Sequence, residues 1–211
     1  ENLHKLVVTD TSTLETTTLT TPDDNARIGN WSPNGDWLVY AIVNGENPGV
    51  RRRNPHGVNE IVTTSGADTN PKYSPDGRWI AYASNETGTN EVYVRPFPNV
   101  SAGQWQVSSR SARYPRWGHG GGELYFQDNG RAPSMWMVEF EAGDVFRFGS
   151  PVVLFGSPGW QGSAQFGESY EVEAGDERFL ITALPKTAGF AGPRYIVVNN
   201  FSEELKRLVP E

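Results

Sequence analysis

Paired carboxylates are the side chains of this sequence best suited to general acid–base chemistry. They occur at Asp23-Asp24, Glu139/Glu141 and Glu171/Glu173. The last two pairs are spaced by two residues, so each pair shares one face of a predicted strand, where solvent or an arginine partner accounts for the charge. A glycosidase needs two carboxyl groups from different elements, and the linear sequence alone does not bring any together. We therefore assign no catalytic residue.

The residue types give little support for a nucleophilic active site or for a metal-binding site. The chain has no cysteine, which excludes disulfides, cysteine-ligated zinc, iron–sulfur clusters and a thiol nucleophile. His4, His56 and His119 share neither an i,i+4 spacing nor a loop, and no Gly-x-Ser-x-Gly elbow is present. The glycine-rich run 118–122 falls at a repeat turn, where it is expected to give flexibility and to point His119 to water. The sequence predicts no metal and no cofactor.

The composition favours short strands joined by many turns. Glycine (23) and proline (15) together make 38 of the 211 residues, and 12% of residues are aromatic, which is typical of β-rich proteins. The length favours one large domain. A net charge of −7 and a pI near 5.1 argue against nucleic acid or an anionic membrane as the main partner. No run of 18 apolar residues is present that could span a membrane.

A repeated segment organises the chain. Each copy has an anchor residue, then a turn, then a strand of alternating apolar residues; the copies are residues 30–40, 72–82, 116–126 and, in degenerate form, 172–181. Their anchors are Trp31, Tyr73, Trp117 and Val172, spaced by 42, 44 and 55 residues. In the turns, proline sets the first position, aspartate or asparagine bonds to the backbone, and glycine takes a positive φ. A period of about 40–45 residues with β-rich content is the signature of propeller blades.

The repeat predicts an all-β fold, a β-propeller of four-stranded antiparallel blades. Residues 1–211 are expected to form a single propeller domain or a propeller fragment. Its full blades are expected at 27–64, 70–108, 113–154 and 168–209. Residues 1–20, with strand-like runs at 5–8 and 13–19, are expected to add an N-terminal half-blade. The fourth strand of the third blade is expected at 145–154 and that of the last blade near 204–209, although residues 202–208 also fit a short helix.

The turn motifs resemble those of a known family. Trp31-Ser32-Pro33-Asn34-Gly35 and Tyr73-Ser74-Pro75-Asp76-Gly77 resemble the repeat of TolB-type β-propellers, and residues 194–210 resemble the last propeller blade found behind bacterial serine/threonine kinases. The third and fourth turns depart from the motif. Members of the family serve as protein-interaction modules, as sensor domains or as the gating propeller of prolyl-oligopeptidase-type peptidases. The resemblance therefore implies a propeller whose natural C-terminus is present and whose N-terminal blades are absent, in a periplasmic or extracellular location.

The loop face of such a propeller is where binding residues are expected. If the Ser-Pro-Asp-Gly turns lie on one face, the loops between blades and between second and third strands lie on the other, and loops on a rigid scaffold are the usual carriers of function. Residues 156–167 form the longest break in the repeat and carry Trp160 and Phe166. Arg113 and Glu168, at the start of innermost strands, are expected to line the channel. The candidate ligand- or partner-binding residues are Asp68, Arg110, Arg113, Arg131, Trp160, Phe166, Glu168 and Phe190.

Three functional hypotheses follow from these residues. The leading one is a non-enzymatic module that binds a protein or peptide through its loop face, because catalytic motifs are missing. The second is a self-assembling structural protein, since the half-blade leaves unpaired strand edges that could pair between chains and give a homo-oligomer. The third is a hydrolase or lyase acting on glycans or peptides with carboxylates and arginines at the channel mouth.

Overall fold

The structure is a computed structural model, and it describes residues 4–21, 23–44, 48–54, 57–62, 66–130, 133–143, 146–156, 170–183 and 194–198. Every regular element within these ranges is a β-strand, which confirms the predicted all-β fold. The chain divides into two compact units, residues 1–105 and 106–211. Within the described ranges there is no helix long and apolar enough to cross a membrane.

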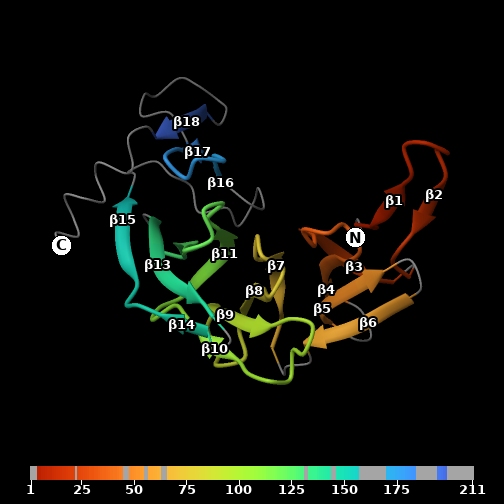
Figure 1. The fold of residues 1–211 in the computed structure, drawn as a ribbon, viewed down its shortest axis with the longest axis horizontal. Coiled ribbons are helices and arrows are strands. Elements are labelled where there is room, and N and C mark those ends of the chain that lie inside the picture. Colours follow the sequence, from red (N-terminus) through yellow and green to blue (C-terminus); the bar gives the residue numbers. More distant parts are fainter. Residues whose placement is uncertain are drawn as a thin grey trace. The chain divides into compact units, whose positions relative to one another are not determined.

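The first unit begins with a two-stranded hairpin followed by a four-stranded sheet, named sheet A (Figure 1). The hairpin pairs β1 (Val7–Thr9) with β2 (Thr16–Thr18) in antiparallel register, in agreement with the strand-like runs seen in the sequence. Sheet A has the strand order β3-β4-β5-β6, and all neighbouring strands are antiparallel. Its strands are β3 (Asn25–Trp31), β4 (Leu38–Asn44), β5 (Gly49–Asn54) and β6 (Gly57–Val62).

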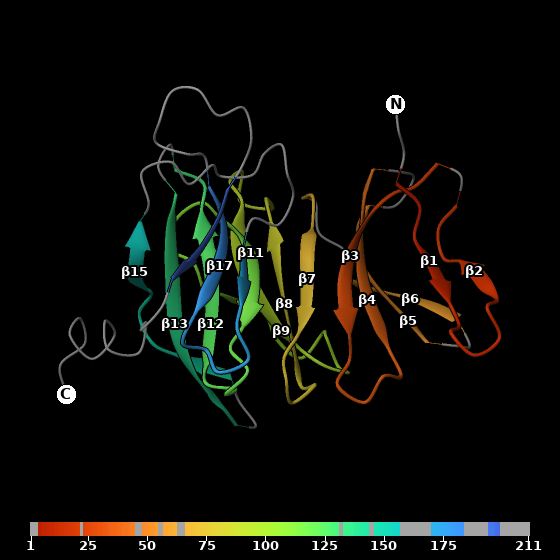
Figure 2. The same cartoon turned by 90° about the horizontal axis from the view of Figure 1, so that it is seen from above.

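Sheet B completes the first unit with the order β10-β9-β8-β7. Its strands are β7 (Thr69–Tyr73), β8 (Trp79–Ser84), β9 (Glu91–Pro96) and β10 (Trp105–Gln106). Strand β7 lies beside β3 and β4 of sheet A (Figure 2). The approach requires glycine at position 29, because a Cβ there would clash with the carbonyl oxygens of Val39 and Pro71. The Lys72 ammonium donates across the gap to the Gly29 carbonyl oxygen at 3.0 Å.

The second unit opens with sheet C, which departs from prediction at its fourth strand. Its first three strands are β11 (Ala112–Trp117), β12 (Glu123–Asp128) and β13 (Ser134–Ala142). The single strand expected over 145–154 is wrong: β14 (Phe146–Phe148) and β15 (Val152–Gly156) instead pair with successive parts of β13. The break falls at Gly149-Ser150-Pro151, where proline has no N–H to donate to the ladder.

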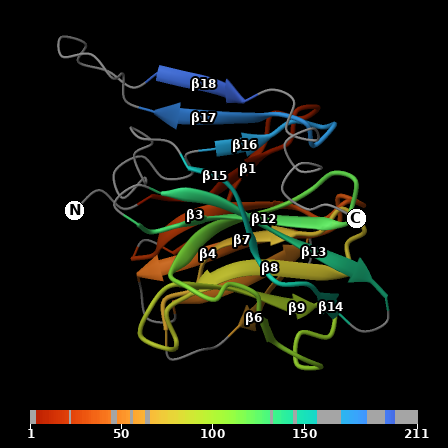
Figure 3. The ribbon, with the colours of Figure 1, turned by 90° about the vertical axis from the view of Figure 1, so that its left-hand side faces the viewer.

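Sheet D follows with three described strands in the order β16-β17-β18 (Figure 3). They are β16 (Tyr170–Val172), β17 (Phe179–Ala183) and β18 (Arg194–Val198), paired antiparallel. The expected fourth strand near 204–209, and the alternative helix at 202–208, lie outside the described residues.

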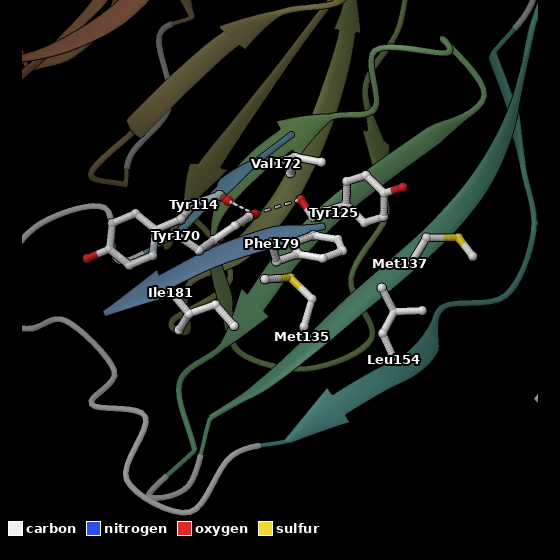
Figure 4. Packing of buried hydrophobic residues seen from close by; sticks show 9 residues of the cluster. All are labelled: Tyr114, Tyr125, Met135, Met137, Leu154, Tyr170, Val172, Phe179 and Ile181. Atoms are coloured by element: carbon white, nitrogen blue, oxygen red, sulfur yellow. Dashed lines mark hydrogen bonds between the residues drawn. The ribbon is translucent and has the colours of Figure 1, made fainter. Parts of the chain in front are cut away.

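Each unit buries its own apolar core between successive sheets. In the first unit, sheet A and sheet B share a cluster formed by Val39, Val50, Val62, Tyr73, Ile80, Tyr82 and Tyr93. In the second unit, sheets C and D share a cluster formed by Tyr114, Tyr125, Met135, Met137, Leu154, Tyr170, Val172, Phe179 and Ile181 (Figure 4). The hydroxyl group of Tyr170 donates to the carbonyl oxygens of Tyr114 at 2.5 Å and Tyr125 at 3.2 Å, so the two sheets are joined by a buried polar contact as well as by packing.

The repeat turns join the first and second strands of each sheet. In the turn of sheet B, the Ser74 hydroxyl donates to Asp76 Oδ1 at 2.5 Å and accepts from the Trp79 N–H at 3.0 Å. The turn of sheet A has the same contacts through its own serine. The turns of sheets C and D lack this hydroxyl but keep the backbone hydrogen bond across the turn. The Gly118 N–H donates to the Glu123 carbonyl oxygen at 2.8 Å, and the Glu173 N–H donates to the Arg178 carbonyl oxygen at 2.9 Å. The backbone hydrogen bond across the turn is therefore present even where the Ser-Pro-Asp-Gly motif is absent.

Candidate interaction site

The loop end of sheet C carries the described candidates that are accessible to a partner. The register sets Ala112 of β11 opposite Asp128 of β12. The chain segments that precede Ala112 and follow Asp128 consequently leave sheet C at the same end. Two candidate arginines, Arg110 and Arg113, come from the first of these segments and from the start of β11. The repeat turn at 118–122 joins the opposite ends of the same two strands.

Arg110 lies over an indole ring. Its guanidinium carbon is 4.3 Å from the centre of the Trp136 ring, a distance suited to a cation–π contact. Arg110 is exposed, whereas Trp136 is buried with 8% of its surface accessible. The indole thus fixes one face of the guanidinium plane while the arginine remains in contact with solvent.

Asp128 holds the neighbouring loop in place. Its Oδ1 accepts from the N–H groups of Gly130 at 3.2 Å and Ser134 at 3.0 Å, and its Oδ2 accepts from Trp136 Nε1 at 3.0 Å. Asn129 joins this loop to the segment before β11, because its N–H donates to the Ser111 carbonyl oxygen at 3.0 Å. The side chains of the same two residues are 3.1 Å apart. Both segments around Arg110 are thereby anchored to the sheet.

Arg113 is the second candidate at this end of sheet C. It pairs with Gln127 in the register of β11 and β12 and is partly buried. Its Nε is buried without a hydrogen-bond partner among the described residues. A backbone irregularity follows it in the strand, where Tyr114 has a φ of 59°. Arg113 therefore sits beside a β-bulge, a feature that re-aims side chains near functional sites.

Asp68 lies in the other unit and is fully buried, with none of its surface accessible. The position that a Cβ on Gly49 would take is 4.0 Å from Asp68 Oδ2. Burial raises the pKa of Tyr82, and the charges of Asp68 and Glu86 add to that rise. Asp68 is placed in the interior of the unit and not on the loop surface. The remaining candidates, Arg131, Trp160, Phe166, Glu168 and Phe190, lie outside the described residues.

Two residues of this site were not singled out from the sequence. Trp136 falls inside a predicted strand, where an indole is expected to serve the core. Asp128 precedes an Asn-Gly pair, and aspartate in that position commonly bonds to turn N–H groups, so this signal was available. The stacking of Arg110 on Trp136 joins residues 26 positions apart and depends on the pairing of three strands.

Carboxylates gather at the opposite end of sheet C. Glu123 and Glu139 stand directly opposite each other on β12 and β13, and both line an open depression of about 580 Å³ together with Arg147. Burial raises the pKa of Glu123 above its ordinary value, and the charges of Asp176 and Glu139 raise it further against a hydrogen bond from Tyr125. Among the described residues, no cluster of histidine, aspartate and glutamate is arranged to hold a metal ion.

The fold agrees with known structures, although no protein-family model matches the chain. It is similar to TolB from Acinetobacter baumannii, with 16% identity, coverage of 93% of this chain and 46% of that chain, and a TM-score of 0.65. It is similar to an oligogalacturonate lyase in complex with manganese, with 14% identity, coverage of 96% and 55%, and a TM-score of 0.66. It is also similar to a putative TolB from Agrobacterium tumefaciens, with 18% identity, coverage of 64% of this chain and 51% of that chain, and a TM-score of 0.53.

The chain spans about half the length of these TolB structures, 46% and 51%. The antiparallel sheets, the turn between their first and second strands, and the likeness to TolB agree with one another. At these identities the likeness is evidence of fold. The protein is a β-propeller module with the TolB-type propeller fold.

Proposed function

We propose that this propeller module is a non-enzymatic binder of a protein or peptide, and that it takes an acidic segment at the loop end of sheet C. The observation that carries the proposal is Arg110, whose exposed guanidinium lies 4.3 Å above the Trp136 ring. Among the described residues, no carboxylate forms a salt bridge with Arg110. An arginine at this place is therefore available to a carboxylate from outside.

The chemistry of the guanidinium group favours a carboxylate ligand. Stacking on Trp136 occupies one face of the plane and leaves the N–H groups at its edge, where they can bond both oxygens of a carboxylate at once. An arginine already held by a ring loses less conformational freedom on binding than a mobile one. Asp128 and Asn129 hold the adjacent loops, which further limits the ordering that a partner must impose.

The partner is inferred to be a protein or peptide because the site is open and lies on loops. Arg110 is flanked by backbone and by the short polar side chains of Ser109 and Asn129. Such a surface can bind an extended polypeptide. Arg113, one strand position into the sheet, supplies a second cation for a neighbouring acidic residue. The net charge of −7 disfavours a polyanion at long range, so a short acidic stretch fits better than a nucleic acid.

The test is binding of fluorescent peptides that carry two or three acidic residues, with peptides of the same length in which the acids are replaced by amides. Arg110→Ala is expected to weaken binding of the acidic peptides about tenfold or more, which is the loss of one charge-assisted contact. Arg147→Ala is the matched control, because Arg147 is exposed on β14 of the same unit and removes the same charge. Equal effects of the two variants, or equal binding of acidic and amide peptides, would contradict the proposal.

A hydrolase or lyase acting on glycans or peptides is the second candidate, and Glu123 is the observation in its favour. A half-buried carboxyl with a raised pKa, 3.0 Å from the Tyr125 hydroxyl, has the properties of a general acid. One of the structural neighbours is an oligogalacturonate lyase. Turnover on a panel of glycans and peptides that is lost in Glu123→Gln and kept in Glu141→Gln would establish this candidate. Absence of turnover in the unaltered protein would remove it.

A further inference from the structure

Equivalent residues of the repeat differ sharply in exposure at the two ends of the chain. The anchors Tyr73, Trp117 and Val172 are 3%, 7% and 4% exposed, whereas the first anchor, Trp31, is 50% exposed. On the second strands, by contrast, the exposed residue lies in the last sheet and not in the first. Val39, Ala81 and Tyr125 have no accessible surface, whereas Leu180, at the same repeat position in sheet D, is 43% exposed.

These exposures follow from the way neighbouring sheets pack. Tyr73 of sheet B is buried against Val39, Val50 and Val62 of sheet A, so this anchor points back toward the preceding sheet. Val172 of sheet D is buried in the same way among residues of sheet C that include Tyr125. Within each unit, the anchor face of the second sheet therefore fits the second-strand face of the sheet before it.

The anchor face of sheet A is only partly covered. The N-terminal hairpin packs Leu6 and Leu19 against Tyr40 and Ile42, but a groove of about 400 Å³ remains between β1 and sheet A. Trp31 and two further exposed apolar residues, Ile28 at 67% and Val7 at 54%, line this groove. Exposed apolar surface gathered in one groove is a mark of an interaction site.

We propose that a second copy of this chain fills the groove, with the second-strand face of its sheet D, at Leu180, packed on the anchor face of sheet A, at Trp31. The chain repeats this pairing twice inside its own units, as Tyr73 on Val39 and as Val172 beside Tyr125. Sheet D exposes the second-strand side of this pairing at Leu180, and sheet A exposes the anchor side at Trp31.

The contact is heterologous, because different surfaces of the two copies meet. The absence of cysteine in the sequence makes it testable with single thiols. Trp31→Cys and Leu180→Cys proteins are prepared separately, mixed, and treated with a short bismaleimide. The matched control is Val153→Cys, on β15 of sheet C, with an exposure of 44% against 43% for Leu180.

The expected result is a cross-linked dimer in the mixture of Trp31→Cys with Leu180→Cys, and at least about tenfold less when Val153→Cys replaces either partner. Light scattering behind size exclusion of the unaltered chain is expected to show a dimer or larger species, and Trp31→Asp is expected to shift it to monomer. Because Trp31 is half exposed, that variant should keep its thermal midpoint. A monomer at every concentration, or cross-linking of Trp31→Cys mainly with itself, would overturn the proposal. Peptide binding at Arg110 is measured separately, so its outcome is independent of this one.

Discussion

Asp176 of the fourth turn accepts hydrogen bonds from the third turn, where its Oδ1 lies 2.9 Å from the His119 N–H. Its Oδ2 accepts from the Gly120 N–H at 2.7 Å, and His119 Nδ1 lies 3.1 Å from Oδ1. Asp176 stands where the other turns have glycine and has a φ of 58°. An aspartate in this left-handed conformation costs about 1–2 kcal/mol relative to an ordinary one, and the contacts to the neighbouring turn account for its presence.

Removal of the Asp176 carboxylate should therefore destabilise the second unit. Asp176→Ala is expected to lower the free energy of unfolding by about 1–3 kcal/mol, since two N–H groups lose their acceptor and alanine fits a positive φ poorly. Asp176→Asn is the matched control, because asparagine keeps one acceptor oxygen and tolerates this backbone conformation. Urea unfolding measures both. An alanine variant as stable as the asparagine variant would show that the contact between the turns contributes nothing.

Ser74 should contribute to stability through its hydroxyl group. Ser74→Ala removes the bonds to the Trp79 N–H and to Asp76, and a loss of about 1 kcal/mol is expected for such a buried turn contact. Ser101→Ala, at an exposed position of the same unit, is expected to change the free energy of unfolding by less than about 0.5 kcal/mol. Similar small changes in both variants would mean that the backbone bonds alone maintain the turn, as they do at Gly118.

The buried hydroxyl of Tyr170 should join sheets C and D. Tyr170→Phe leaves the carbonyl oxygens of Tyr114 and Tyr125 without this donor, and the expected loss is about 1–3 kcal/mol. The thermal midpoint should fall by about 2–4 °C for each kcal/mol in a chain of this size. Tyr93→Phe removes a hydroxyl that bonds to the partly exposed Glu91, so a smaller shift is expected. Equal shifts would contradict the role assigned to Tyr170.

Glu123 should make the stability of the protein fall as pH rises. Its pKa in the folded protein is raised above the ordinary 4.5, first by burial and then by Asp176 and Glu139. The folded state then holds the proton more tightly than the unfolded chain, so this contribution is complete below 4.5 and is lost as pH rises through the folded pKa. Glu123→Gln is expected to gain stability over the unaltered protein at neutral pH but not in acid, while Glu141→Gln, at an exposed site, shows no such difference. Parallel pH curves for all three proteins would contradict this.

Much of the fold was predictable because turn chemistry and alternation are local properties. The residues around Ser32 and Ser74 define both hairpins, and the strands that follow them lie where the alternation places them. The break between β14 and β15 was missed although Pro151 marks it, because the apolar residues on both sides read as one strand. His119, expected to point to water, contacts Asp176 from 57 positions away, and no local pattern reports such a contact.

The candidate site was less predictable for a related reason. The loop argument selected Arg110, which is exposed, and Asp68, which is buried. Arg113 was selected as a channel-lining residue at the start of an innermost strand, and its binding role stays a prediction. Position in a loop does not determine exposure when a neighbouring strand covers the residue. The exposure of Trp31 was not anticipated either, because repeat symmetry predicts equal burial for all anchors. That symmetry fails at sheet A, because the hairpin that packs on its anchor face has two strands and leaves Trp31 half exposed.

Hydrogen exchange of the protein with and without its tightest acidic peptide tests the central claim most directly. Binding at the loop end of sheet C predicts slower exchange of backbone N–H groups in residues 108–113 and 128–130, with the N–H groups of the turns at 74–78 and 118–122 unchanged. The same peptide should give no protection in the Arg110→Ala protein. Protection confined to the turns, or protection at residues 108–113 that survives in Arg110→Ala, would contradict binding through Arg110.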